Sequence, residues 1–311
     1  MAIAIDTQKP RTGMTDPAGA HEDTDDAAGL YGPRSEAWRL NREAMLLFGS
    51  GPRSLLLQIA HPLVAEGVDQ HSDFRADPWA RLVATVRSYL TVVYGSERQA
   101  RAEIARLNRL HRSIVGPVRD PEAGAITGAR AYAARDPELS LWVHATLVDS
   151  MIVAYDAWIE PLSRARREAY YEETRPIGRA FGITDDLLPP DLAAFERYLE
   201  RMLAPGGPVT VTPTARSLAE TILHPSLGPL VPAVAPILGR IPAGTYDWTL
   251  WPSLALLPEP IREGYRIAWT PVNRVVAGWL LTSWRAWLPV LPPRLRWFSA
   301  ASNAARRVAD Q

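Results

Sequence analysis

Residues 136–159 read DPELSLWVHATLVDSMIVAYDAWI, and this run is the strongest indication of the architecture. Asp136 followed by Pro137 is typical of a helix cap and first turn. Between Leu139 and Tyr155 the only charged residue is Asp149, so a helix here is apolar on nearly all sides. We therefore expect a buried central helix in an all-α protein.

Helical spacing of apolar residues continues on both sides of this run, and no convincing strand alternation occurs. Before it we predict helices over residues 34–48, 53–59, 78–95 and 96–116. The first is expected to end at the break of residues 49–52, and the second at His61-Pro62. Ser96 and Gln99 match a capping box for the fourth.

After the central run we predict helices over residues 163–181, 191–203, 213–223, 260–269, 272–287 and 293–308. Residues 1–30 are polar and acidic without apolar periodicity, which is typical of a flexible tail. We divide the rest into a helical core over residues 31–205 and a Pro/Trp-rich helical extension over 206–311, packed on that core. The expected fold is one multi-helix domain, a globin-like bundle around a cofactor pocket.

Composition excludes several functions. The 34 basic and 34 acidic residues cancel, so the chain lacks the positive field that binds nucleic acid. The absence of cysteine excludes disulfides, thiol catalysis and thiolate-ligated haem. No glycine-rich phosphate loop follows a strand.

The chain start lacks the charged and apolar parts of a secretory signal, which predicts a cytoplasmic location. The longest apolar stretch, residues 275–290, is interrupted by Arg285 and is shorter than the roughly 18 residues of a spanning helix. Five tryptophans nearby leave peripheral membrane contact open, although core packing is the preferred explanation: Trp269, Trp279, Trp284, Trp287 and Trp297.

Two histidines fall on apolar stripes. Ile104, Leu107, His111 and Val115 share one helix face, which directs His111 toward the core. His144 lies on the central helix in the same way. A buried neutral imidazole needs a hydrogen bond or a metal. From spacing alone, a core histidine bonded to a backbone carbonyl is the preferred explanation for each.

Polar residues on the third predicted helix form a short row. Arg81 and Thr85 stand four residues apart, so both lie on one face. Such a pair can hydrogen-bond a bound oxygen species or a cofactor carboxylate, or it can lie on a solvated surface. Separately, His71 and Asp73 form a His-x-Asp pair that, with a distant histidine, would match a non-haem iron site. It falls in a segment that we predict to be an interhelical loop.

Six motifs in order carry a resemblance to a known family. They are Arg42-Glu43, the run from Gly51 to Pro62, Gly67-Val68 with His71-Ser72, Arg81-Leu82 with Thr85, Leu110-His111, and the run from Leu141 to Thr146. The series resembles the family of the mycophenolic-acid oxygenase MpaB and the catalytic domain of latex clearing protein, a bacterial rubber oxygenase. The resemblance covers residues 34–181 well and the C-terminal third poorly.

The resemblance implies a helical fold around haem b that activates dioxygen for oxidation of isoprenoid carbon–carbon double bonds. It implies that His111 is the iron ligand, that Arg81 and Thr85 form the polar pair on the opposite side, and that His144 lies near the haem. Arg42 and Arg53 would supply cations for the haem carboxylates, although Arg53 equally suits a structural ion pair. His71 is also carried over as a cofactor-binding residue.

Two departures narrow the expected substrate. Rubber-cleaving members carry a lysine just before the distal threonine, where this chain has Ala84. They are also exported. We therefore expect a smaller apolar, isoprenoid or lipid-like unsaturated substrate, with an unassigned redox partner. The alternatives are the non-haem iron oxygenase and a non-catalytic helical protein that binds lipid or haem.

Overall fold

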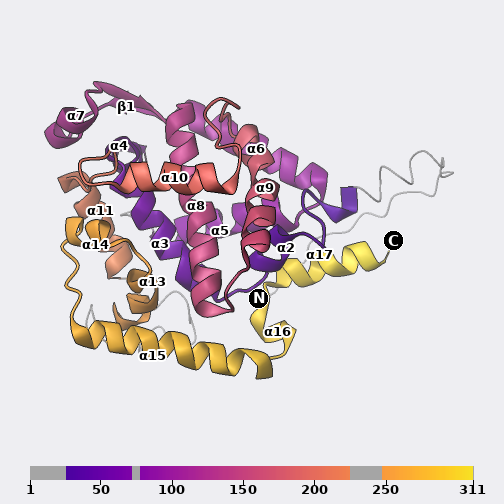
Figure 1. The fold of residues 1–311 in the computed structure, drawn as a ribbon. Coiled ribbons are helices and arrows are strands. Elements are labelled where there is room, and N and C mark those ends of the chain that lie inside the picture. The colour runs from indigo at the N-terminus through magenta and orange to yellow at the C-terminus, as the bar shows by residue number, and fades with distance from the viewer. Residues whose placement is uncertain (1–25, 72–77, 225–246, 311) are drawn as a thin grey trace, which may run out of the picture.

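Helix α8 (Pro137–Trp158) runs through the middle of the molecule (Figure 1). The computed structural model describes residues 26–71, 78–224 and 247–310. Over these residues it is a helical bundle with one two-stranded sheet. The Asp136 side chain accepts a hydrogen bond from the Glu138 amide and caps α8, and most of the helix is buried. The all-α prediction and the buried central helix are confirmed.

The elements before α8 are α2 (Glu36–Asn41), α3 (Leu46–Ala60), α4 (Pro62–His71), α5 (Pro78–Tyr94), α6 (Glu97–Arg112), β1 (Val115–Pro117), α7 (Pro121–Thr127) and β2 (Ala131–Ala133). Those after it are α9 (Arg164–Ala180), α10 (Leu192–Leu203), α11 (Pro213–Leu223), the 3-10 turn η2 (Asp247–Leu250), α13 (Trp251–Ala255), α14 (Glu259–Gly264), α15 (Pro271–Trp287), the 3-10 turn η3 (Leu288–Val290), α16 (Pro293–Arg296) and α17 (Ser299–Ala309).

The helices predicted from caps form where they were expected. Helices α5, α8, α9, α10, α11 and α15 match their predicted bounds within two residues. The Ser96–Gln99 capping box at the start of α6 is present, with both reciprocal bonds. Helix α6 ends at Arg112 rather than near residue 116. Capping is local chemistry, which explains why sequence alone located these helix starts.

The predicted break at residues 49–52 is wrong, because α3 continues through it. Gly49 instead allows α3 to pack closely on α8: a Cβ there would lie 2.6 Å from Nε1 of Trp158. The chain breaks earlier, between α2 and α3. There Glu43 pairs with Trp297 in an isolated antiparallel bridge, and its carboxylate accepts a 2.8 Å bond from Arg296. A contact with the far C-terminal segment therefore sets this boundary.

Residues 67–71 also differ from the prediction, because they belong to α4 and not to a loop. His61 ends α3 and its Nδ1 accepts a hydrogen bond from the Leu63 amide, 3.3 Å away. Pro62 then occupies the first position of α4, where a missing amide hydrogen costs nothing. The chain therefore changes direction at His61-Pro62 and begins a new helix.

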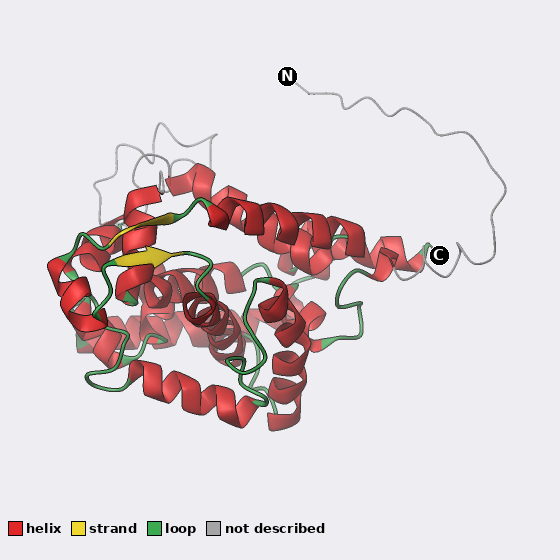
Figure 2. Ribbon diagram, turned by 90° about the horizontal axis from the view of Figure 1, so that it is seen from above, coloured by secondary structure: helices red, strands yellow, loops and turns green. Residues whose placement is uncertain are grey.

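A small hairpin follows α6. Strands β1 and β2 pair antiparallel, with Val115 opposite Ala133, and Figure 2 shows them side by side against the helices. Helix α7 connects them and ends at Gly128, whose φ of 66° favours glycine. Val115 is therefore not part of the α6 stripe, and its side chain is exposed. Strands of three residues are too short to be recognised by alternation.

The C-terminal third packs into the same core as the first helices. Leu218 of α11, Leu254 of α13 and Ile261 of α14 belong to one buried cluster with α3 and α8. Helix α14 is shorter than the predicted 260–269 helix, and the predicted 293–308 helix is divided into α16 and α17. The division falls at the bridge to Glu43.

Residues 26–30 belong to the predicted tail, and the structure shows them attached to the bundle. Asp26 accepts hydrogen bonds from the Arg98 amide and guanidinium at 2.8 and 3.0 Å. Ala27 is buried, and its carbonyl accepts a bond from Arg307. Residues 1–25 lie outside the described part of the chain. No helix among the described residues combines the length and apolar character needed to cross a bilayer.

Candidate functional site

Helices α5 and α6 form an antiparallel hairpin that places Arg81 and His111 near its open end. Only two residues separate the helices, and Arg106 of α6 donates a 3.1 Å hydrogen bond to Ser88 Oγ of α5. The positive charge of Arg81 acts on His111. Thr85 lies one turn from Arg81 on α5 and is exposed. The structure therefore brings together Arg81 and His111, with Thr85 beside Arg81.

His111 is partly buried, on the face of α6 that also carries the buried Ile104. Burial lowers the pKa of His111, and the positive charges of Arg135 and Arg81 lower it further. Its ring makes no hydrogen bond with the described residues. The imidazole is therefore neutral at neutral pH and retains a nitrogen lone pair, which is the form that binds a metal ion.

Arg135 was not identified by sequence reasoning. It follows β2, and its guanidinium lies beside Gly182: a Cβ on Gly182 would be 3.6 Å from Arg135 Nη2. Arg135 therefore connects the β1–β2 hairpin to the loop after α9. Its position near His111 results from the β1–β2 pairing, which no local sequence signal indicated.

Asn108 connects α6 directly to α9. One turn before His111, its Nδ2 donates a 2.8 Å hydrogen bond to the Ala180 carbonyl. A cavity of about 320 Å³ lies between these two helices. It is lined by Leu30, Tyr31, Arg101, Ile104, Ala105, Asn108, Glu173, Pro176, Ile177 and Ala180. Its volume is at the lower end of the roughly 300–1,000 Å³ typical of ligand pockets.

His144 lies on α8 in a dry environment. Its Nε2 is buried and has no hydrogen-bond partner in the described part of the chain. Burial lowers the pKa of His144 to about 4, so the ring is neutral at neutral pH. The backbone carbonyl bond expected of an ordinary core histidine does not occur at Nε2. A buried unpaired polar atom is costly, which makes this nitrogen a candidate for binding a ligand.

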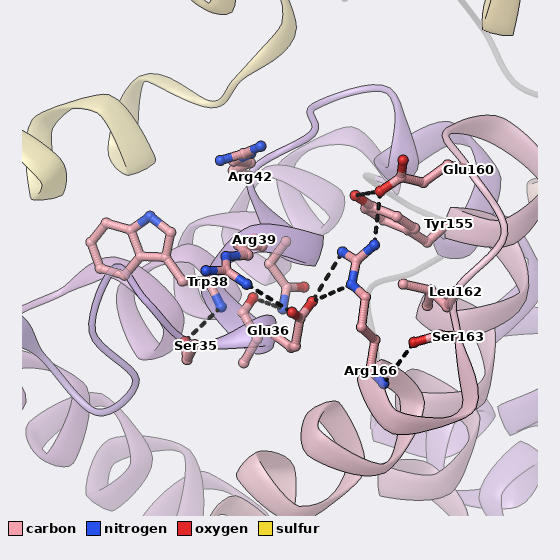
Figure 3. Close-up of polar contacts among 12 residues, drawn as sticks. Ser35, Glu36, Trp38, Arg39, Arg42, Tyr155, Glu160, Leu162, Ser163 and Arg166 are labelled. Carbon is pink, nitrogen blue, oxygen red and sulfur yellow. Dashed lines mark hydrogen bonds and ion pairs between the residues drawn. The ribbon is translucent and has the colours of Figure 1, made fainter.

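Two glutamates of this region fix α9 against α2. The carboxylate of Glu36 accepts a 3.1 Å hydrogen bond from Arg166 Nε and forms an ion pair with Nη2 at 3.0 Å, and Arg166 also donates to Glu160 (Figure 3). Glu173, which lines the cavity, accepts hydrogen bonds from the amides of Glu36 and Ala37 at 3.2 and 2.7 Å. These bonds hold one wall of the cavity in place.

Arg53 and Arg42, the two cations expected to bind haem carboxylates, both have protein partners. Arg53 is 4% exposed; it donates hydrogen bonds to the Leu256 carbonyl and to Ser150 Oγ and forms an ion pair with Asp149 Oδ2, all within 2.8 Å. This matches the structural ion pair that the sequence also allowed.

The Arg42 guanidinium lies 4.3 Å from the centre of the Trp297 ring, and its Nε is 3.5 Å from a carboxylate oxygen of Glu43. Neither Arg42 nor Arg53 is among the charges that shift the pKa of His111. The structure brings Arg81 and Arg135 there instead.

His71 lies at the exposed end of α4. Its Nε2 is 3.1 Å from the Val115 carbonyl oxygen, and its ring meets the edge of Tyr132. Asp73 lies outside the described residues. Among the described side chains, no group of three or more histidines and carboxylates is arranged to hold a metal ion.

Fold and site define a multi-helix protein with a neutral imidazole, His111, near two arginines and a second neutral imidazole, His144, on its buried central helix. The chain belongs to the family described as ER-bound oxygenase mpaB/B'/rubber oxygenase, catalytic domain, whose model matches residues 38–291. This match extends beyond residues 34–181, the part of the chain that carries the six motifs, and it includes α15.

Two curated mycobacterial proteins are similar to this chain. Both are named as uncharacterized, one from Mycobacterium bovis and one from Mycobacterium tuberculosis. Each is 28% identical over 156 residues, which covers 48% of this chain and 57% of the relative. The match thus spans little more than half the length of these relatives. No solved structure shows a significant match.

Proposed function

We propose that this protein is a haem b-dependent oxygenase in which His111 binds the iron. The observation that carries the proposal is the state of that side chain. The His111 imidazole is partly buried, its pKa is lowered, and no described residue hydrogen-bonds its ring. A neutral imidazole is the side chain that ligates haem iron in globins and peroxidases.

The surrounding residues suit such a group. Arg81 and Arg135 provide positive charge beside His111, which would balance the haem carboxylates or a developing negative charge on oxygen. Thr85 adds a hydroxyl donor next to Arg81 on α5. When bound, haem would supply the activation of dioxygen, its co-substrate. The chain itself supplies the orientation, the charges and the apolar surroundings.

His144 would remain neutral throughout the physiological pH range. Its Nε2 has no hydrogen-bond partner among the described residues and lies against Gly178. A Cβ at position 178 would be 3.4 Å from this nitrogen, in van der Waals contact. This arrangement holds a hydrogen-bonding atom in a site that excludes water. We assign His144 the role of orienting a polar group of the bound cofactor or substrate.

The cavity between α6 and α9 supports a small apolar substrate. Six of its ten lining residues are apolar, and the polar or charged ones are Tyr31, Arg101, Asn108 and Glu173. Its volume of about 320 Å³ suits a short lipid-like or isoprenoid molecule better than a polymer segment. The alanine at position 84, in place of the lysine of rubber-cleaving members, agrees with a different substrate.

Haem and iron content of the purified protein tests this proposal. Protein produced with added haem precursor should contain one haem per chain, and it should consume dioxygen when given an unsaturated isoprenoid or fatty acid. Iron without porphyrin, lost on Asp73→Ala, would instead favour the non-haem site. Haem without oxygen consumption across such substrates would indicate a binding protein.

A further inference from the structure

Helix α15 lies along one edge of the molecule, and no other described element lies beyond it in Figure 1. One side of it packs on α13 and α8. Ala277 is buried on that side, and Trp284 meets Trp158 edge to face. The opposite side has no partner in the described part of the chain.

The outer side of α15 is apolar. Val272, Val275, Trp279 and Trp287 lie on it, and η3 and α16, which follow in the chain, carry Val290 and Leu295. All six side chains are between 64% and 71% exposed. The first three residues stand at positions i, i+3 and i+7, so they form one stripe. A contiguous exposed apolar surface of this kind usually marks an interaction site.

The other tryptophans of this region have different surroundings. Trp269 faces the Arg262 guanidinium at 5.4 Å, and Trp297 donates a hydrogen bond to Glu43. Together with Trp284 they are explained by the fold. Of the five tryptophans, only Trp279 and Trp287 have no contact within the described fold that explains their position. The structure thus separates the five tryptophans into three that pack and two that project outward.

The charged residues of α15, η3 and α16 have one sign. Residues 264–309 contain seven arginines and no acidic residue. Three of the arginines, Arg274, Arg285 and Arg294, are exposed on α15 and α16. We refer to these three, together with the six apolar residues above, as the α15 face.

We propose that the α15 face binds peripherally to the surface of an anionic phospholipid bilayer. Tryptophan rings favour the headgroup level of a membrane, and valine and leucine favour the acyl boundary. Arginines next to the stripe would pair with lipid phosphates. Because no described helix can span a bilayer, the contact would be made by α15 lying in the membrane plane.

Charge also argues against a second copy of this chain as the occupant. In a two-fold dimer the same patch meets itself. The three arginines of the α15 face would then enter the interface without acidic partners on α15, η3 or α16. An anionic surface removes this repulsion. This inference does not depend on the haem proposal.

Co-sedimentation of the full chain with vesicles tests the inference. Vesicles of phosphatidylcholine alone are compared with vesicles that also contain phosphatidylglycerol. We expect binding to the anionic vesicles that is weakened by salt. Replacing both exposed tryptophans (Trp279→Ser with Trp287→Ser), or the three arginines by glutamine, should reduce the affinity about tenfold or more.

The control changes a similar pair of residues at the opposite edge of the molecule. Val115→Ser with Arg119→Gln alters an exposed valine and an exposed arginine at β1 and should leave vesicle binding unchanged. Thermal unfolding confirms that each variant is folded. Equal binding by all variants, or no binding by the wild type, would overturn the inference. A wild-type dimer that the tryptophan variant disperses, without vesicle binding, would identify a second copy as the occupant.

Discussion

Gly178 of α9 lies against the imidazole of His144 of α8, so that a Cβ at position 178 would be 3.4 Å from His144 Nε2. The same Cβ would be 3.2 Å from Ile183 Cδ1. The absence of a side chain at position 178 therefore lets α9 pack closely on a buried nitrogen that has no partner among the described residues.

Enlarging Gly178 should destabilise the protein in steps. In Gly178→Ala the methyl group needs only a small shift of Ile183, and the gain in helix propensity offsets part of the cost. In Gly178→Val the branched side chain would meet both Ile183 and His144, which should cost about 1–3 kcal/mol. Urea unfolding of the three proteins measures this, and equal stability of the valine variant would contradict the geometry.

His144 should make the protein less stable in acid. Its pKa falls from 6.5 in the unfolded chain to about 4 in the folded chain, because burial disfavours the charged ring. The folded state binds the proton less well, so stability is full above pH 6.5 and declines as the pH falls toward 4. The full effect is up to about 3 kcal/mol.

The variant His144→Leu isolates this effect, because leucine does not titrate. Burial also lowers the pKa of His61 to about 4, so the variant should keep the part of the acid sensitivity that His61 causes. Free energies of unfolding measured across pH 4–7 should thus depend less on pH in the variant. An unchanged pH dependence would mean that His144 is not a neutral buried group.

Removing either arginine near His111 should raise the pKa of His111. Both Arg135 and Arg81 disfavour the charged imidazole, so Arg135→Leu or Arg81→Leu should move the titration upward. An NMR titration of the His111 ring protons in the haem-free protein measures the change. Arg98→Leu is the matched control, since this residue lies about 20 Å away at the other end of α6. A shift equal to that of the control would contradict the proposed proximity.

Breaking the buried pair of Arg53 and Asp149 should be costly. The Arg53 guanidinium is 4% exposed and lies 2.7 Å from the Asp149 carboxylate. Arg53→Leu leaves that carboxylate and the Leu256 carbonyl without their donor, which should cost about 3–5 kcal/mol in the free energy of unfolding. The double variant Arg53→Leu with Asp149→Leu should lose less than the sum of the single variants. Additive losses would show that the pair does not act as a unit.

Local chemistry made much of the helical framework predictable. Asp136 before Pro137 and the Ser96–Gln99 box are contained within a few residues, and both cap helices as predicted. The boundary between α2 and α3 depends on Glu43 meeting Trp297, some 250 residues later, so no window of sequence contains it. Gly49, read as a helix end, is instead a contact surface for Trp158.

The candidate site was predictable only in part. The α6 stripe pointed to His111, and the resemblance pointed to Arg81, Thr85 and His144. The positions of Arg135 and Gly178 result from the strand pairing and from the packing of α8 on α9, which spacing does not encode. Likewise, Arg53 of α3 meets its partners on α8 and in the segment after α13, so only the folded structure shows whether it forms the structural ion pair.

The visible absorption spectrum of the freshly purified protein tests the central claim most directly. The account predicts a haem Soret band in the wild type that is lost in His111→Ala. In His144→Ala the band should remain, because that histidine is assigned no iron bond. A colourless wild-type protein from haem-supplemented cells, or a Soret band that His111→Ala leaves unchanged, would contradict the assignment of His111 as the iron ligand.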